Sequence, residues 1–372
     1  MSDPDLPQPD QVDGAPHPRE TARLFGQDNA EATFLKAYSA GRLHHGWLLT
    51  GAKGLGKATL AWRIARFLLA TPPDAGDGLF GAPPPPTTLD ISPDHPVARR
   101  MLALSEPGLF LLRRGWDDKA KRLRTQLTIE EVRKLKGFFS LSAADGGRRV
   151  VIVDAMDELN TNAANAILKL LEEPPANTTL LMVAHQPSRL LPTIRSRCRE
   201  LRLAPLDAED MARALGQAGA ELRSDDAQAL AALSSGSVGA AIRLLNHDGL
   251  RLYADLVALL GTAPRLDRPR AIALGESTAG KGKEARLDLA LSLTDTLMAR
   301  LVRTGVTGLP PAPEAAPHEA EILARLAPNP HSARRWADLA QHAGDRARHA
   351  RAVNVDPAAL VLDLVLQLAR AA

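Results

Sequence analysis

Cysteine is almost absent from this sequence of 372 residues, which contains only Cys198. A disulfide framework is therefore impossible, and a zinc site made of four cysteines is excluded. Taken alone, Cys198 is expected to be a small buried hydrophobic residue. Aromatic residues make up only 3% of the chain, so its cores must be built mainly from leucine, alanine, valine and isoleucine.

Long apolar runs are also missing, and no stretch approaches the ~20 apolar residues that cross a membrane. The first residues are rich in proline and aspartate and do not have the basic-then-apolar pattern of a signal peptide. We therefore expect a cytoplasmic protein with a disordered tail at residues 1–18. The net charge of +3 is too small to indicate nucleic-acid binding by itself.

Glycine is concentrated at one place, TGAKGLGKATL at residues 50–60, which has the G-x-x-x-x-G-K spacing of a phosphate-binding loop. An apolar strand pattern, GWLLT, precedes it and a helical pattern, KATLAWRIARFLLA, follows it, as such a loop requires. Backbone N–H groups at Gly51, Gly54 and Gly56 could surround phosphate oxygens, and Lys57 could reach the outer phosphates. A glycine-rich turn without a ligand is the alternative, and the pattern leaves nucleotide occupancy open.

Two positions on which nucleotide hydrolysis depends carry alanine. Ala58 stands where a hydroxyl normally holds magnesium, and Thr59 is rotated from it by about 100° on the helix, within reach of an inner phosphate only. Asp154 ends the apolar run VVIV and fits a metal-ordering carboxylate, or else caps a turn. Ala155 stands where a glutamate usually orients the attacking water. The two alanines together predict a chain that hydrolyses ATP poorly or not at all.

Strand and helix patterns alternate up to about residue 203, and only helical patterns follow. Further strands are predicted at GLFLLRRGW, RRVVIVD, TTLLMVAHQ and CRELRLAPL. The spacing of Thr128 and Glu131 predicts a capping box with a helix from Ile129. A later helical pattern, NAANAILKLLEEPP, is expected to end at Pro174. Residues 71–98 contain so much proline and glycine that we expect an irregular excursion. The alternation predicts an α/β fold with a parallel sheet covered by helices on both faces.

Basic residues cluster twice. Arg195, Arg197 and Arg199 lie within five residues, and an arginine fixed at the edge of an element can stabilise charge on a neighbour's triphosphate. Pairing with nearby carboxylates is the alternative, which spacing alone favours. On the helix from residue 129, Arg133 and Lys134 could face DNA phosphates without reading sequence. A solvated charged loop is the preferred interpretation for residues 119–124, and base stacking is not expected because no aromatics interleave.

Four segments together carry a family resemblance: LLPTIRSRC, LNTNAANAILKLLEEPP, LFGQ near the start and SSGSVGAAIRLL further along. From about Thr21 onward the chain resembles the clamp-loader branch of the AAA+ ATPases, and within it the delta-prime subunits of bacterial DNA polymerase III. The resemblance implies a RecA-like AAA+ domain at residues 19–203 and a small helical lid at 204–247. It also implies an all-helical collar at 248–372 that joins subunits in a hetero-pentamer.

The same resemblance implies roles for individual residues. Arg197 would be an arginine finger acting in trans on the ATP site of a neighbouring subunit. Arg243 would lie at the sensor-2 position of the lid, and Val183–His185 at the end of the sensor-1 strand. The degenerate nucleotide site would comprise Gly51, Gly54, Gly56, Lys57, Thr59, Asp154 and Arg243. The implied partners are gamma/tau and delta subunits, the sliding clamp and primed DNA, with no membrane.

Departures from the family pattern limit these expectations. Many relatives carry a four-cysteine zinc module, but residues 71–127 contain no cysteine, so we expect no zinc and no other metal site. His44, His45 and His95 are too scattered to form one. ATP is expected to bind, if it does, without efficient hydrolysis. An active motor of the gamma/tau type is the main alternative, and a standalone DNA-binding protein is a third, which the small net charge disfavours.

Overall fold

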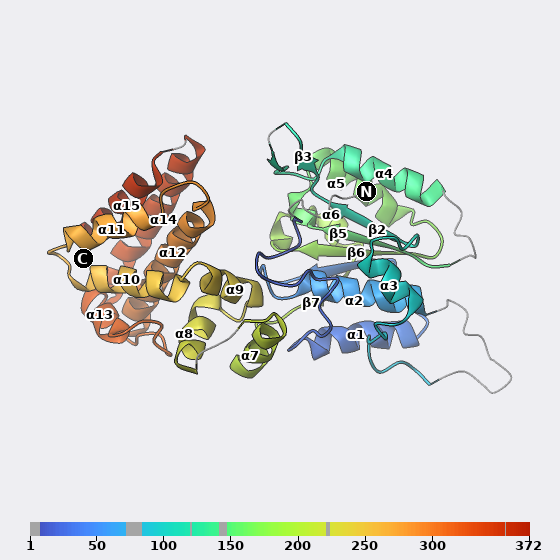
Figure 1. Cartoon of the computed structure of the whole chain (residues 1–372), viewed down its shortest axis with the longest axis horizontal. Helices are drawn as coiled ribbons and strands as arrows, with labels where there is room; N and C mark the ends of the chain where they lie inside the picture. The colour runs from blue at the N-terminus through green and yellow to red at the C-terminus, as the bar shows by residue number, and fades with distance from the viewer. Residues whose placement is uncertain (1–7, 72–83, 120, 141–146, 221–223, 354) are drawn as a thin grey trace. The chain divides into compact units, whose positions relative to one another are not determined.

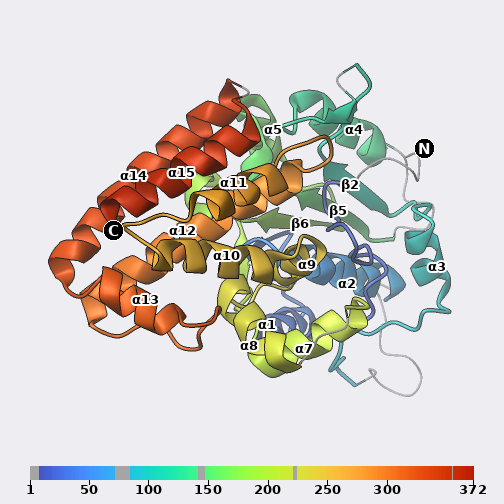
Figure 2. The same ribbon diagram turned by 60° about the vertical axis from the view of Figure 1, so that its left-hand side comes forward.

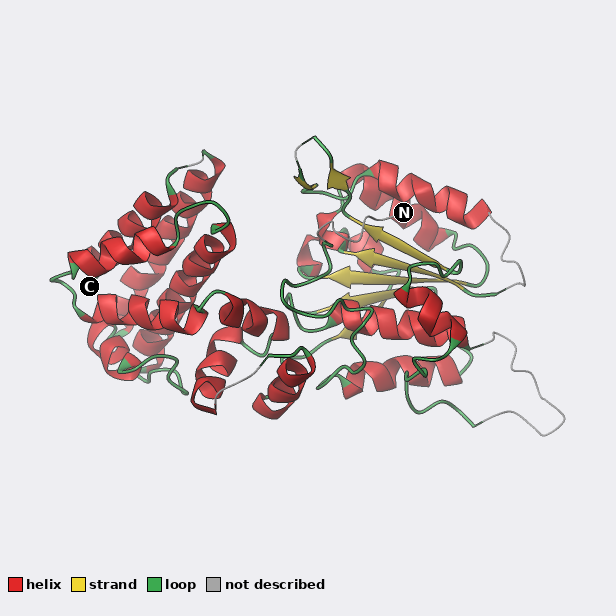
Figure 3. Cartoon of the chain, viewed as in Figure 1, coloured by secondary structure: helices red, strands yellow, loops and turns green. Residues whose placement is uncertain are grey.

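The structure is a computed structural model of the chain, and it describes residues 8–71, 84–119, 121–140, 147–220, 224–353 and 355–372. The chain divides into two compact units, Met1–Leu206 and Asp207–Ala372. The first unit contains strands and helices, and the described part of the second contains helices alone (Figure 3).

The first unit is built on a five-stranded parallel sheet with the strand order β2-β5-β6-β1-β7. Its strands are β1 (Gly46–Thr50), β2 (Leu109–Arg113), β5 (Arg149–Asp154), β6 (Thr178–Ala184) and β7 (Arg199–Arg202). Every residue of β1 and β6 is buried, because strands inside a parallel sheet are covered on both faces. The sheet thus confirms the α/β fold predicted from the alternation of patterns.

Two hydrophobic cores lie on opposite faces of the sheet, since successive side chains of a strand point to opposite sides. Trp47 and Leu49 enter the core beneath α1 (Asp28–Ser39), α2 (Lys57–Ala70) and α3 (Pro96–Leu102). Leu48, between them, enters the core beneath α4 (Ile129–Ser140) and α5 (Thr161–Glu172). Figure 1 shows the two sets of helices on opposite sides of the sheet.

The predicted helix boundaries are largely confirmed. The helix α4 begins at Ile129, and the backbone N–H of Thr128 donates to the Glu131 carboxylate at 3.1 Å, as in a capping box. The helix α5 ends at Glu172, shortly before the two prolines. The one-turn helix α6 (Pro192–Arg195) then leads into β7. The basic segment interpreted as a loop contains a short hairpin instead, β3 (Trp116–Asp117) with β4 (Arg122–Leu123).

Residues 72–83 of the expected excursion lie outside the described residues. Its described part, from residue 84, contains no helix or strand until α3 begins at Pro96. The side chain of His95 caps that helix by accepting the N–H of Val97 at 3.2 Å. No helix within the described ranges is long and apolar enough to cross a membrane.

The N-terminal segment differs from the disordered tail expected at residues 1–18. Residues 1–7 lie outside the described residues, but Asp10 and His17 in the following segment make buried contacts. Asp10 lies 2.7 Å from Arg113 and 3.2 Å from His17, and the side chains of Asp10 and His17 are only 4% and 1% exposed. Composition misled the prediction here, because ion pairs rather than apolar side chains hold this segment.

The second unit consists of the helices α7 (Ala208–Gln217), α8 (Ser224–Ser234), α9 (Val238–Asn246), α10 (Gly249–Gly261), α11 (Arg268–Ser277), α12 (Glu284–Thr307), α13 (Glu319–Leu326), α14 (Pro330–Ala352) and α15 (Pro357–Ala371). The long helices α12 and α14 pack along one another, and α11 packs on α15 (Figure 2). The carboxylate of Glu319 is buried between Tyr253, whose hydroxyl donates to it at 2.6 Å, and Arg300, whose Nε donates at 2.6 Å. The expected division of this unit into lid and collar stays a prediction.

Candidate functional site

The loop between β1 and α2 has the backbone shape that phosphate binding requires. Gly51, Gly54 and Gly56 have φ values of +136°, +85° and +90°, which residues with side chains rarely adopt. Gly56 is the N-cap of α2, so the first N–H groups of that helix, which have no partner inside it, face the loop. These groups and the positive end of the helix dipole form a place for an anion.

Lys57, the first residue of α2, turns its ammonium group toward the loop. Its Nζ donates to the carbonyl oxygens of Gly51 at 2.7 Å and of Ala52 at 2.5 Å. Burial lowers the pKa of Lys57 to about 8, against the opposing influence of Asp154 and Asp157. The side chain therefore remains mostly protonated at neutral pH and keeps the positive charge that a phosphate group would need.

Asp154 ends β5 at the same edge of the sheet. Burial raises the pKa of its carboxyl group to about 7, and the charges of Asp10 and Glu158 raise it as well, while Lys57 lowers it. Lys57 and Asp154 each shift the pKa of the other, so the two charged groups lie close enough to interact. A carboxyl group that is half protonated near neutral pH is a weak ligand for a metal ion.

The two alanines stand in this site as the sequence implies. Ala58 follows Lys57 in the first turn of α2, and Ala155, which follows Asp154, is only 1% exposed. Thr59 is 8% exposed and belongs to the buried side of α2. The residues present therefore fit a phosphate group, but they do not fit the magnesium ion that normally accompanies it.

His185 follows β6 beside the loop. Burial lowers the pKa of its imidazole to about 4, and the positive charge of Lys57 acts in the same direction. Its backbone N–H donates to the Asp157 carboxylate at 2.9 Å, which fixes the end of the strand. The imidazole is therefore neutral at physiological pH. The sequence indicated this position only through the family resemblance.

Arg197 lies in the turn between α6 and β7, and its side chain is 40% exposed. Its Nη1 donates to the Thr193 carbonyl at 3.1 Å, and its Nη2 lies 3.1 Å from the Glu172 carboxylate at the end of α5. The pairing with a carboxylate that spacing favoured is thus present within the chain. The partial exposure leaves part of the guanidinium accessible to another molecule.

The other two arginines of this segment are placed differently. Arg199 lies over the ring of Trp47, with 5.3 Å between its Cζ and the ring centroid. Arg195 is exposed on α6. Within the part of the chain that the structure describes, Arg197 is the one of the three that lies in a turn and contacts a carboxylate.

The remaining predicted site residues lie on helices that do not form the loop after β1. Arg133 and Lys134 are exposed on α4, and Arg243 is exposed on α9 of the second unit. Part of the basic run has partners: Arg114 lies 2.7 Å from Glu158, and Arg124 lies 3.6 Å from Glu131. Within the part of the chain that the structure describes, no group of three His, Cys, Asp or Glu side chains is arranged to hold a metal ion.

Two structural features at this edge were missed in the sequence. The Gln27 side chain accepts the N–H of Ala204 at 3.0 Å and donates to its carbonyl at 2.8 Å, which joins the start of α1 to the segment after β7. Asp10 reaches the site from the N-terminal segment. Neither produces a periodic pattern, so no signal in the single sequence could have identified their partners.

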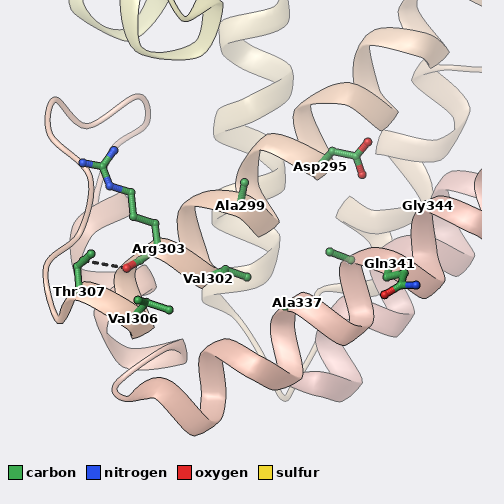
Figure 4. Close-up of a pocket in the computed structure, with 10 residues that line it drawn as sticks. Asp295, Ala299, Val302, Arg303, Val306, Thr307, Ala337, Gln341 and Gly344 are labelled. Carbon is green, nitrogen blue, oxygen red and sulfur yellow. Dashed lines mark hydrogen bonds between the residues drawn. The ribbon is translucent and has the colours of Figure 1, made fainter. Parts of the chain in front are cut away.

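A groove of about 660 Å³ lies between α12 and α14 of the second unit (Figure 4). Its walls are mainly small and apolar, with Ala299, Val302 and Val306 on α12 and Ala337 and Ala340 on α14. It has neither the glycine-rich backbone nor the group of charges found at the loop after β1. The groove is therefore not a second phosphate site.

A parallel sheet of this strand order, with a glycine-rich loop after β1 and an aspartate at the end of β5, is the arrangement of a P-loop α/β domain. Comparison with known proteins narrows the class. Residues 26–207 match the family model described as "DNA polymerase III, delta subunit". Over these residues the chain is therefore similar to this family of DNA polymerase III subunits.

Individual relatives agree with this assignment. The chain is 39% identical to the DNA polymerase III subunit delta' of Pseudomonas aeruginosa, over 54% of this chain and 55% of that protein. It is 32% identical to subunit delta' of Escherichia coli, over 57% and 58%. It is 27% identical to subunit tau of Escherichia coli, over 76% of this chain but 41% of tau. The alignments thus span little more than half the length of the delta' relatives.

Proposed function

We propose that this chain is a delta-prime-type subunit of a bacterial clamp loader, which helps to place the sliding clamp on primed DNA and contributes an arginine to a neighbour's ATP site. The similarity to subunits named delta' supports the assignment. The site supports a subunit that does not hydrolyse ATP itself. Its loop has the shape of a phosphate-binding loop, but Ala58 replaces the hydroxyl that binds magnesium and Ala155 replaces the glutamate that orients the attacking water.

The proposed contribution in trans follows from the position of Arg197. A guanidinium remains charged at all physiological pH values and can donate two parallel hydrogen bonds to phosphate oxygens. Arg197 extends from a turn that is fixed between α6 and β7, and its side chain is partly exposed. When such a group meets the phosphate that is being transferred, it stabilises the charge that develops in the transition state.

The wider assembly is part of the same proposal. Its partners would be gamma/tau and delta subunits in a hetero-pentamer, together with the clamp and primed DNA in the cytoplasm. Residues 204–247 would act as a lid, with Arg243 at the sensor-2 position, and residues 248–372 as a collar. Arg133 and Lys134, exposed on α4, would contact DNA phosphates.

The test is ATP hydrolysis by a clamp loader reconstituted with clamp and primed DNA, containing this chain as wild type, Arg197→Ala or Arg195→Ala. We expect Arg197→Ala to slow the ATP site that it serves by about 10³-fold or more, so that total turnover falls by the share of that site. Arg195→Ala, a change of the same kind on α6, should leave turnover unchanged. Equal turnover with all three chains in an intact complex would contradict the assignment.

The isolated chain provides the second half of the test. We expect no magnesium-dependent hydrolysis of ATP above background, because the residues that would hold the metal and orient the water are alanines. Turnover by the isolated chain, abolished by Lys57→Ala, would favour the motor of the gamma/tau type instead.

A further inference from the structure

The N-terminal segment of residues 8–20, called the strap below, is held at both of its ends. At one end the Asp10 carboxylate lies 2.7 Å from Arg113 Nη1, at the carboxyl end of β2. Gln8 supports this contact, because its Oε1 accepts from Arg113 at 3.1 Å and from Arg19 at 2.9 Å. The strap is thus latched to the sheet through the guanidinium of one strand residue.

The other end of the strap rests on α2, the helix that begins at the phosphate-binding loop. His17 sets its ring edge-on against Trp62, with centroids 5.8 Å apart and planes at 84°. Arg66 Nη2 donates to the carbonyl of Arg19 at 2.6 Å. His17 also joins the two ends, since its Nε2 lies 3.2 Å from Asp10. Aromatic contact and hydrogen bonds therefore fix the strap to the helix as well as to the strand.

The course of the strap crosses the edge of the sheet where a nucleotide would enter. Ligands of open α/β sheets bind beyond the carboxyl ends of the strands. Arg113 is the register partner of Asp154 at that edge, and Figure 1 shows the dark-blue N-terminal segment passing in front of the strand ends. Just after the strap, Leu24 lies so close to Gly56 that a Cβ there would come within 2.5 Å of Leu24 Cδ1.

The strap also adds negative charge to the site. Burial alone would raise the pKa of Asp10, but the hydrogen bond from His17 and the charge of Arg113 outweigh it and lower the pKa to about 2. The ionised carboxylate is near enough to Asp154 to affect its titration, in a region that also contains Glu158. A polyphosphate would have to approach this group of carboxylates.

We propose that the strap closes the nucleotide site of this chain, so that ATP binds the degenerate loop only when the contact between Asp10 and Arg113 opens. The proposal rests on the candidate nucleotide site and not on the role of Arg197 or on clamp loading. It assigns the N-terminal segment a regulatory function at that site. It also gives a second reason, besides Ala58 and Ala155, why the chain is not a motor.

The test measures ATP binding by the isolated full-length chain with titration calorimetry, in wild type, Asp10→Asn, Gln8→Ala and Glu20→Gln. Asp10→Asn is expected to tighten ATP binding about tenfold, because it removes the charge-assisted hydrogen bond between Asp10 and Arg113 that holds the strap closed. Gln8→Ala weakens the latch without changing charge, and we expect about threefold tighter binding. Glu20→Gln removes a half-exposed charge at the end of the strap and should have no effect.

Hydrogen exchange in the same proteins distinguishes opening of the strap from simple charge removal. We expect amides of residues 8–20 to lose protection when ATP binds, and to be less protected in Asp10→Asn even without ATP. Equal ATP affinity of Gln8→Ala and wild type would overturn the proposal, as would ATP binding with the strap still protected. None of these outcomes depends on turnover by the assembled loader, so the proposal fails or stands separately from the proposed function.

Discussion

Asp154 illustrates how single residues in this site depend on their neighbours. Burial and the negative charges of Asp10 and Glu158 raise the pKa of Asp154, whereas the positive charge of Lys57 lowers it. The raising effects are larger, so the pKa moves from 3.8 to about 7. A carboxyl group with a raised pKa in the folded state stabilises the fold fully below pH 4. This contribution is lost as the pH rises toward 7, because only the unfolded chain then ionises without cost.

We therefore expect Asp154→Asn to stabilise the first unit more at pH 8 than at pH 5. The gap in the free energy of unfolding between variant and wild type should widen by roughly 2 kcal/mol over this interval. Urea unfolding of both proteins at the two pH values measures it. A gap that does not change with pH would show that Asp154 is ionised throughout and that Lys57 outweighs burial.

The sequence predicts the positions of some residues of the site but not of others. Lys57, Asp154 and Ala58 were predictable because the loop spacing and the strand end fix their positions relative to one another. Asp10 was not, since its partner Arg113 lies 103 positions later in the chain. Ion pairs between distant segments leave no period in a sequence, and only the folded chain brings them together.

At the scale of single elements, α5 shows how a helix end is compensated. The side chain of Asn160 caps its start by accepting the N–H of Ala163 at 2.9 Å. Its end carries Glu172 and Glu173, which the helix dipole disfavours. Arg197 lies 3.1 Å from the first of these carboxylates, and so the turn before β7 offsets the unfavourable charge. No pattern in the sequence identifies this partner.

Glu172→Gln should separate stability from function at this element. The change removes a negative charge from the C-terminal end of the helix, which stabilises the fold, and removes a half-exposed ion pair, which destabilises it. Each effect on the free energy of unfolding is below about 1 kcal/mol. We expect the melting temperature to move by less than about 4 °C. Turnover by the reconstituted loader should nevertheless fall severalfold, because Arg197 loses the carboxylate that orients it. Glu173→Gln is the matched control, and an equal effect of both changes would contradict a positioning role for Glu172.

At the scale of the whole molecule, the two units have separate cores. The first surrounds a sheet, whereas the second is formed by helices around contacts such as the buried Glu319 with Arg300 and Tyr253. The alternation of strand and helix patterns up to about residue 203 predicted this change of architecture. The further division near residue 247 had no comparable signal, since helices lie on both sides of it and differ little in composition.

Separate cores predict separate unfolding transitions. Trp47, Trp62 and Trp116 belong to the first unit and Trp336 to the second, so fluorescence of a Trp336→Phe variant reports the first unit alone. Circular dichroism at 222 nm reports the helices of both. We expect the two signals to follow different urea dependences. Superimposable curves would indicate one cooperative unit instead.

Cys198 has a practical consequence for labelling. Its Sγ–H donates to the Ile194 carbonyl at 3.0 Å, and burial raises the pKa of the thiol to about 12. Since the thiolate is the reactive form, the natural thiol is nearly inert toward maleimides at neutral pH. A cysteine introduced on the strap would therefore be the thiol that reacts with a maleimide dye. Cys198 need not be replaced for such labelling, and the neighbouring Arg197 keeps its position.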